Sequence, residues 1–531
     1  MSEPAKPAQP KDAAAVILLK HHTNLANPEV FLVRRSQKLS FLGGYHAFPG
    51  GQFDQTDAEA PVENCPDAET CIAVGCAARE LFEETGVLVA RGGDTLTRGQ
   101  RASLLDDLQS GRMTWPALLR HYNLHLDAAD FTFVGRWVTP PFSARRFDTW
   151  FFLVNCPPKQ RAEVVEGELD LGDWVPAGEA LARWQRSEIL AVPPVIHALK
   201  TLSGGINDDL VERFLSIPNA HREPVRRIEF RPNYICFPVR TPTKPPATHT
   251  NCYLIYTTEE LIVLDPGSPY EDEQQELANA IDELAGAGRR VREIILTHLH
   301  PDHVGGVRAL QEHLGDVKVA AHRLTAEPLA RTMPVDRLIE DNDVIELRGS
   351  PTIRLQAVHT PGHTRGHLCF YEARTGTLIS GDNIVGLGSV LIEPEEGNMR
   401  DYLKSLKRMR QLPDLSVIFG GHGPAMGNPY QKIDEYINHR LEREQNILRA
   451  IKEGATSVKD IVARVYTDVS PKAHPMAERA VAAHLEKLIE DDAVSVENDM
   501  FLVSARQRES QGSQGQEGGL APAPSSINIQ D

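Results

Sequence analysis

The chain has 531 residues, a formal net charge of −17 and 41% hydrophobic residues. This length predicts two to four domains, and the acidic balance argues against a protein that binds nucleic acid mainly through charge. No run approaches the roughly 20 apolar residues of a membrane span, and the N-terminus lacks the apolar core of an export signal. Seven cysteines are scattered without a C-x-x-C pair. This favours a reducing compartment, so we expect a cytoplasmic location and no membrane partner.

The first 90 residues predict an α/β unit with an acidic helix. Residues 1–11 are rich in Pro, Ala and Lys and are expected to be disordered, and the runs AAAVILL and EVFLVRR are typical of strands. After a glycine-containing turn and a polar insertion, a helix is predicted to carry Glu80, Glu83 and Glu84 on one face. Adjacent carboxylates repel one another unless a cation binds, and oxygen ligands suit Mg²⁺ or Mn²⁺. A solvated acidic face is the alternative.

The string RELFEETG, after FPGG, resembles the box of the Nudix hydrolases. The resemblance implies an α/β/α sandwich that cleaves a diphosphate linked to another moiety. Glu80, Glu83 and Glu84 would hold the metal, Glu83 would take part in catalysis, and Arg79 would brace them. An insertion separates Gly51 from Arg79, the first residue of the box, and members similar to the coenzyme A diphosphatases also have an insertion at this point. Residues 35–51 partly resemble their signature, with Ser40 where a second arginine is expected.

Further candidates lie downstream in the same unit, which we place at residues 12–222. Arg145 and Arg146 form a basic turn that meets either phosphate or solvent, and Glu168 is an additional candidate metal ligand. The stretch EGELDLGDWVPAGEAL fits a last strand and helix.

The second unit, residues 223–430, is organised around the motif THLHPDH at residues 297–303. It follows a strand-like run, VREIIL. His298 and His300 are two apart and therefore share one face of an extended segment. After a proline turn, Asp302 and His303 form a second pair. One loop thus presents ligands to two cations about 3.5–4 Å apart, with zinc favoured and iron or manganese as alternatives. A histidine-rich surface turn is the competing interpretation.

Three more candidate ligands follow apolar runs, each beside glycine: His363 in HTPGHTRGH, Asp382 in LISGDNIVG and His422 in VIFGGHGP. In this order the motifs resemble the metallo-β-lactamase superfamily over about residues 230–430. The resemblance implies a four-layer αββα sandwich with a binuclear site between the sheets.

The same resemblance implies a distribution of ligands. The first zinc ion would take His298, His300 and His363, the second would take Asp302, His303 and His422, and Asp382 would bridge them. Asp265 would orient a histidine from outside the ligand set. We expect His359 and His367 to lie outside the ligand set and His249 to pack near the groove. Asp302 could also accept or relay the proton of a water in hydrolysis of esters, thioesters, lactams or phosphodiesters.

The last part predicts three helices and a two-stranded wing within residues 431–506, followed by a disordered tail at 507–531. A metallo-β-lactamase core followed by a winged helix resembles the β-lactamase-like protein 2 group, which includes RNA endonucleases. The third helix carries more acidic than basic residues, which favours a structural cap or a dimer surface over a nucleic-acid interface.

The first hypothesis is therefore a hydrolase with two sites. A binuclear zinc site would hydrolyse an ester- or thioester-type small molecule, and a Nudix site would cleave a nucleoside-diphosphate-linked, coenzyme A-like compound. One alternative is an endonuclease of single-stranded RNA with the Nudix domain as an accessory. Another is a nucleotide sensor in which that domain binds without cleaving. The oligomeric state is left open.

Overall fold

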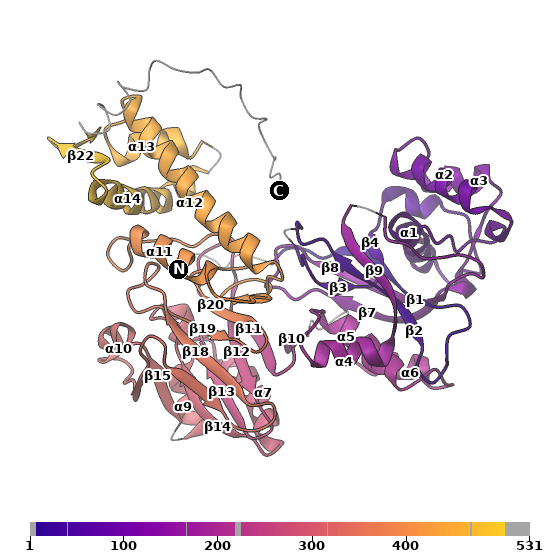
Figure 1. Ribbon diagram of the computed structural model, residues 1–531, viewed down its shortest axis with the longest axis horizontal. Coiled ribbons are helices and arrows are strands. Elements are labelled where there is room, and N and C mark those ends of the chain that lie inside the picture. Colours follow the sequence, from indigo (N-terminus) through magenta and orange to yellow (C-terminus); the bar gives the residue numbers. More distant parts are fainter. Residues whose placement is uncertain are drawn as a thin grey trace.

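The computed structural model describes residues 7–504 except residues 40, 166, 218–224, 316, 468 and 469. Figure 1 shows three parts in chain order: an N-terminal α/β part, a central part with two sheets, and a C-terminal helical part. The comparison at Ser40, the junction expected near residue 222 and the expected disordered tail lie outside the described residues. The first strand begins at Lys11.

The N-terminal part is a seven-stranded mixed sheet with helices on both faces. Its strands are β1 (Lys11–Leu19), β2 (Glu29–Arg35), β3 (His46–Ala47), β4 (Gly50–Gln52), β7 (Thr132–Val138), β8 (Phe147–Asn155) and β9 (Leu169–Pro176). One face packs on α1 (Ala68–Thr85), α2 (Arg98–Gln109) and α3 (Trp115–His121), and the other on α4 (Ala177–Gln185), α5 (Pro193–Ser203) and α6 (Leu210–Phe214). Strands β1 and β8 pair in parallel and are largely buried because both faces are covered.

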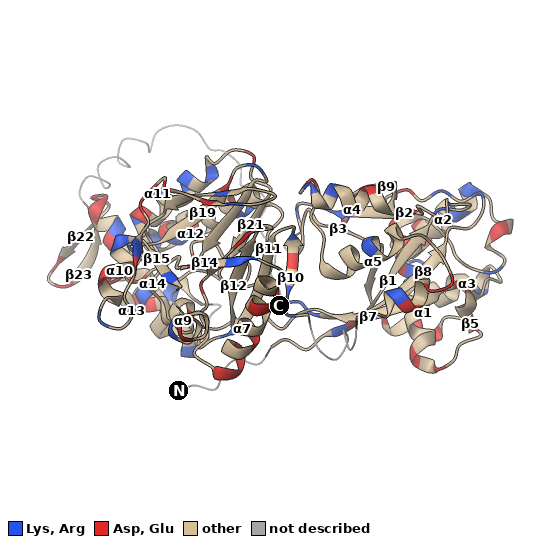
Figure 2. Ribbon diagram, turned by 90° about the horizontal axis from the view of Figure 1, so that it is seen from below, with Lys and Arg blue, Asp and Glu red and all other residues tan. Residues whose placement is uncertain are grey.

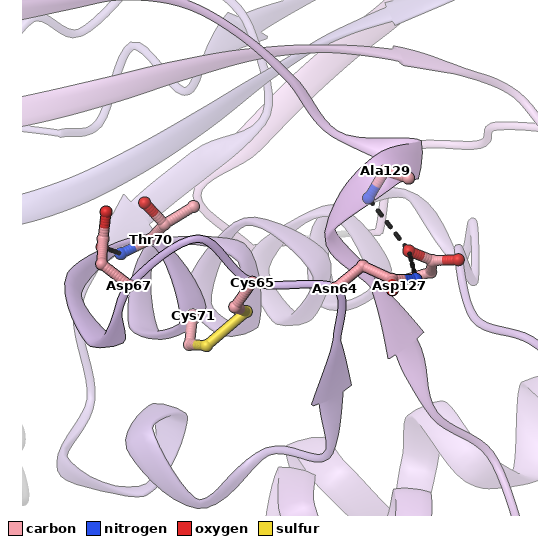
Figure 3. Close-up of a disulfide and its surroundings, with 7 residues drawn as sticks. All are labelled: Asn64, Cys65, Asp67, Thr70, Cys71, Asp127 and Ala129. Carbon is pink, nitrogen blue, oxygen red and sulfur yellow. Dashed lines mark hydrogen bonds between the residues drawn. A yellow bond between two sulfur atoms is a disulfide. The ribbon is translucent and has the colours of Figure 1, made fainter.

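The insertion before α1 is folded against that helix. It contains η1 (Gln55–Glu59) and β5 (Val62–Glu63), which pairs with β6 (Leu126–Asp127). Cys65 and Cys71 form a disulfide with their Cα atoms 5.6 Å apart, next to the α1 cap made by Asp67 (Figure 3). The scattered spacing of the cysteines gave no sign of this pair, which forms because the first turn of α1 brings Cys71 back beside Cys65. The other five cysteines are free and buried.

The central part is a sandwich of two sheets. The first sheet contains β10 (Ile228–Arg231), β11 (Tyr234–Arg240), β12 (His249–Tyr256), β13 (Glu260–Leu264), β14 (Arg290–Ile295), β15 (Lys318–Ala321) and β16 (Arg337–Leu338). The second contains β17 (Val344–Leu347), β18 (Ile353–His359), β19 (Leu368–Glu372), β20 (Thr377–Gly381) and β21 (Val417–Gly420). Apolar side chains from both sheets form the core between them, including Ile262, Ile295, Phe370 and Phe419.

Helices cover the outer faces of this sandwich. The first sheet packs on α7 (Glu271–Gly286), α9 (Val307–Leu314) and α10 (Arg323–Leu329), and the second on α11 (Met399–Arg410) and the start of α12 (Pro429–Lys452). The order of layers is therefore helix, sheet, sheet, helix, as the resemblance to the metallo-β-lactamase superfamily implied.

The C-terminal part consists of the end of α12, α13 (Val458–Val465), α14 (His474–Glu490) and a hairpin of β22 (Val494–Glu497) and β23 (Met500–Val503). It has an apolar core of its own. Helix α14 also contacts the central part, since Arg479 pairs with Glu393 and Arg400 pairs with Glu490. Lys and Arg lie among Asp and Glu on these helices (Figure 2). Among the described residues, no helix is both long and apolar enough to cross a membrane.

Candidate metal centres

The first group of ligands is made of three histidines from two loops. His298 and His300 follow β14, and His363 follows β18. Nδ1 of His300 lies 3.0 Å from Nε2 of His298 and 3.0 Å from Nε2 of His363. A carboxylate oxygen of Asp382, directly after β20, completes this group within 4.8 Å. Residues 65 positions apart thus meet at one point because their strands end at the same edge of the sandwich.

The second group lies on the other side of Asp382. Nε2 of His422 is 3.5 Å from Oδ2 of Asp302 and 3.2 Å from Oδ2 of Asp382. Nε2 of His303 is 3.3 Å from Oδ1 of Asp382. Asp382 therefore contacts ligands of both groups. All seven residues that the sequence predicted as ligands of the two zinc ions are brought together.

Each histidine is held through its second ring nitrogen. His303 donates from Nδ1 to Asp265 at 2.8 Å, and His300 donates from Nε2 to Glu396 at 2.8 Å. His363 and His422 donate from Nδ1 to the backbone carbonyls of Leu391 and His249. These bonds leave the nitrogens that face the cluster free as ligands.

His298 is oriented through a hydroxyl. The hydroxyl of Thr297 donates to Asp265 at 2.6 Å. Nδ1 of His298 lies 2.9 Å from the hydroxyl oxygen of Thr297. Because the threonine proton is already used, His298 donates to this oxygen from Nδ1. Its Nε2 is then unprotonated and faces the cluster.

The acidic face of α1 lines a separate cleft of about 800 Å³ in the N-terminal part. Arg79 donates to Glu80 at 2.7 Å and to Glu83 at 3.0 Å, and the backbone N–H of Gly50 donates to Glu84 at 2.9 Å. Burial raises the pKa of Glu80 to about 7 and that of Glu84 to about 8. Because these three carboxylates lie close together and are partly buried, a divalent cation would stabilise their charged forms.

Comparisons with known proteins match the part of the chain that carries the His/Asp cluster. Residues 245–422 match the family model described as Metallo-beta-lactamase superfamily, and residues 457–501 match the Beta-lactamase associated winged helix domain. A relative from Caenorhabditis elegans, named Beta-lactamase-like protein 2 homolog, is 31% identical over 257 residues, which cover 48% of this chain and 82% of the relative. The chain belongs to the metallo-β-lactamase superfamily. Its central part is the metallo-β-lactamase domain, and its C-terminal part is the associated winged helix.

Two further similarities have different extents. Atrochrysone carboxyl ACP thioesterase nsrC from Aspergillus novofumigatus is 27% identical, with 59% of this chain and 96% of that protein covered. The crystal structure of a NUDIX hydrolase from Alicyclobacillus acidocaldarius is 32% identical to this chain, with 38% of this chain and 95% of that chain covered and a TM-score of 0.33.

The metallo-β-lactamase cluster fits two divalent cations. Nε2 of His303 and Oδ1 of Asp382 are buried and have no hydrogen-bond partner. A Cβ at Gly421 would lie 2.2 Å from that aspartate oxygen, so only glycine leaves the space open. Burial lowers the pKa of His363 to about 3, so this imidazole is neutral, as a metal ligand must be. Burial also disfavours the charged forms of His303 and His422, but the Asp382 carboxylate raises the pKa of both, so a bound cation would replace their protons. Burial works against the charge of Asp382, but His422 and His303 hold its pKa well below its usual range.

The remaining histidines occupy positions outside this cluster. Nε2 of His367 accepts the backbone N–H of Asp382 at 3.2 Å, and His359 stacks on His322. The side chain of His249 bonds to its neighbour Thr248. We conclude that His367 supports the backbone of Asp382.

Two functional contacts were missed from the sequence. Glu396 lies in a loop without a motif, and nothing in its spacing connects it with His300. Asp57 is buried and accepts two hydrogen bonds from Arg79, at 2.8 and 2.9 Å. Its position six residues after Gly51 was an available signal, because it is an acid at a short distance from the glycine pair.

The structure also separates the two arginines of the basic turn. Arg145 lines the carboxylate cleft, whereas Arg146 is bonded to the backbone carbonyls of Thr139 and Ala8. Glu168 lies in the cleft as well, 3.8 Å from Arg35, and its side chain is 69% exposed. The cleft therefore offers Arg35 and Arg145 as cationic groups near the three glutamates.

Proposed function

We propose that the protein is a hydrolase with two separate active sites. The metallo-β-lactamase domain would hydrolyse an ester- or thioester-type small molecule with two zinc ions. The N-terminal part would act as a Nudix hydrolase, with Mg²⁺ or Mn²⁺, on a nucleoside-diphosphate-linked compound of the coenzyme A type. The observation that carries the proposal is the seven-residue His/Asp cluster in which every histidine is fixed through its second nitrogen.

In the metallo-β-lactamase domain, His298, His300 and His363 would hold one ion, and Asp302, His303 and His422 the other, with Asp382 between them. Two such ions supply hydroxide near neutral pH and polarise the substrate carbonyl. Asp302 has a side chain that is 15% exposed at the cluster, so a carboxylate oxygen can accept the proton of the attacking water. Asp265 and Glu396 keep their histidines in the required tautomer.

A thioester is supported by the relative from Aspergillus novofumigatus, which is named a thioesterase. A nucleic-acid substrate has less support because of the charges on α14. Its two basic residues are already paired, Arg479 with Glu393 and Lys487 with Glu444 and Asp491. A helix that binds phosphates needs unpaired cations.

In the N-terminal part, Glu80, Glu83 and Glu84 would hold the metal ion. Glu83 is the most accessible of the residues bonded to Arg79, with 28% of its side chain exposed, against 15% for Glu80. It is therefore the carboxylate best placed to accept a proton from water. Arg35 and Arg145 in the same cleft would bind phosphate oxygens.

The test compares three substrates: an acyl-thioester, an ADP-linked diphosphate and a short single-stranded RNA. Each is given to the wild type, Asp302→Ala and Glu83→Gln, with Zn²⁺ and Mg²⁺ present. We expect the thioesterase activity to be lost only in Asp302→Ala and the diphosphatase activity only in Glu83→Gln. RNA cleavage that requires Asp302 would replace the small-molecule proposal for the metallo-β-lactamase site. Absence of diphosphate cleavage together with nucleotide binding would make the N-terminal part a sensor.

A further inference from the structure

An apolar pocket of about 190 Å³ lies where the N-terminal part meets the metallo-β-lactamase domain. Aromatic rings make much of its wall: Phe41, Trp137, Phe142, Phe147, Phe151 and Phe230. The polar groups of two other lining residues are used inside the protein, since Thr139 accepts the N–H of Phe147 and Ser143 donates to the carbonyl of Arg145. The pocket is therefore suited to carbon, not to a charged or hydrogen-bonding group.

This pocket adjoins the carboxylate cleft. Phe41, Leu42, Phe147 and Thr149 line both cavities. The rings of Phe41 and Phe147 lie against each other with centroids 5.9 Å apart, at the boundary between the two. A molecule whose phosphates bind the arginines of the cleft, and a cation that the glutamates would hold, can therefore extend past these rings into an apolar space.

Residues of the metallo-β-lactamase side complete the pocket. Val225, Ile228 and Phe230 line it from the segment that enters the first sheet of that domain, and Pro424 lines it from the loop after β21. Pro424 is two residues after the ligand His422. The two parts are fixed at this junction by hydrogen bonds from Trp184 to the carbonyl of Phe230 at 3.2 Å and from Asn428 to the carbonyl of Gln37 at 3.0 Å. The N-terminal part alone would leave the pocket open on one side.

We propose that this pocket binds an apolar group carried by the diphosphate substrate of the N-terminal site. The substrate class is then an amphipathic nucleoside diphosphate ester, with its phosphates at the glutamates and an alkyl or acyl chain between the two parts. This inference rests on the proposed diphosphatase function and states which diphosphate substrates that site would prefer. Each methylene buried in such a pocket raises affinity by about fourfold, so a chain of several carbons dominates substrate choice.

The experiment uses two probes that differ only in the apolar group, ADP methyl ester and ADP octyl ester. The variant Val225→Trp fills the pocket from the metallo-β-lactamase side, away from the glutamates. Val211→Trp, on α6 at a site with 37% exposure, is the matched control. We expect the wild type to show at least a tenfold lower KM for the octyl ester. Val225→Trp should remove this preference without changing kcat/KM for the methyl ester, and Val211→Trp should behave as wild type.

Two results would separate a failure of the pocket inference from a failure of the proposed diphosphatase function. If both esters are cleaved in a Glu83-dependent manner with equal KM, the pocket inference is wrong and the diphosphatase function stands. If neither ester is cleaved, the diphosphatase function fails and the inference that rests on it falls too. Calorimetric binding of the octyl ester in EDTA gives a readout without turnover. Equal affinity in the wild type and Val225→Trp would also contradict a role for the pocket.

Discussion

Glu396 accepts a hydrogen bond from Nε2 of His300 at 2.8 Å, across 96 positions of sequence. The other nitrogen of the same ring, Nδ1, faces His298 and His363. The carboxylate thus fixes both the tautomer and the orientation of the candidate metal ligand His300 and lies outside the ligand set itself.

Removing this carboxylate should weaken zinc binding. We expect Glu396→Ala to lower zinc affinity by about 10- to 100-fold, because loss of such a partner frees the ligand ring. The measurement is competition with a chromophoric chelator, and Glu396→Gln should recover part of the affinity because its amide oxygen still accepts the bond. Glu395→Ala, at the exposed neighbouring position, is the control. Unchanged affinity in Glu396→Ala would show that His300 is held by other contacts.

A methyl group at Gly267 should disrupt the same site through the backbone. A Cβ there would lie 1.7 Å from the carbonyl oxygen of Asp302, so the loop that carries Asp302 and His303 must move. We expect Gly267→Ala to reduce the proposed thioester hydrolysis more than tenfold and to bind less zinc than the wild type. Gly286→Ala in α7 has no atom within 4 Å of the new methyl group and should change stability by less than about 1 kcal/mol. Full zinc binding by Gly267→Ala would contradict the requirement for this close approach.

The ion pair between Asp57 and Arg79 should support the carboxylate cleft. Both side chains are buried, and Asp57→Ala leaves the guanidinium without the two hydrogen bonds that it donates to Asp57. We expect a loss of about 3 kcal/mol in unfolding free energy and a diphosphatase defect, with thioester hydrolysis unchanged. Calorimetry and the two activity assays check this. Glu59→Ala on the same short helix, where the side chain is 66% exposed, should have little effect.

Stability without metal should depend on pH through Glu80 and Glu84. Their pKa values of about 7 and about 8 lie above the ordinary value of 4.5, because burial penalises the charged form. A raised carboxyl pKa in the folded state gives stability that is complete below about pH 4.5 and is lost as the pH rises through 7 and 8. We therefore expect the Tm in EDTA to fall between pH 5.5 and 8.5.

The control for this prediction is Glu84→Gln in the same buffers, which shares the loss of zinc but lacks the titrating group. Its Tm should fall less over the same range, and Mg²⁺ should flatten the wild-type curve because the cation stabilises the charged carboxylates. Parallel curves for the wild type and the variant would rule out Glu84 as the cause.

The sequence by itself identified the candidate metal ligands of the metallo-β-lactamase domain, through motifs that resemble those of the superfamily, and predicted the acidic face of α1. Both are local patterns: a ligand that directly follows an apolar strand, or acids three and four apart on a helix, is placed by backbone geometry over a few residues. The order of layers came from the resemblance of these motifs to the metallo-β-lactamase superfamily, which implies helix, sheet, sheet, helix.

Only the tertiary structure decided which groups surround these ligands. The contact of Glu396 with His300, the choice of Arg145 over Arg146 as the residue lining the cleft, and the pocket shared by Phe142 and Pro424 each join segments that no local pattern connects. Their proximity follows from how the two sheets stack and how the N-terminal part meets the sandwich. That packing depends on the summed burial of many side chains, and no short stretch of sequence encodes it.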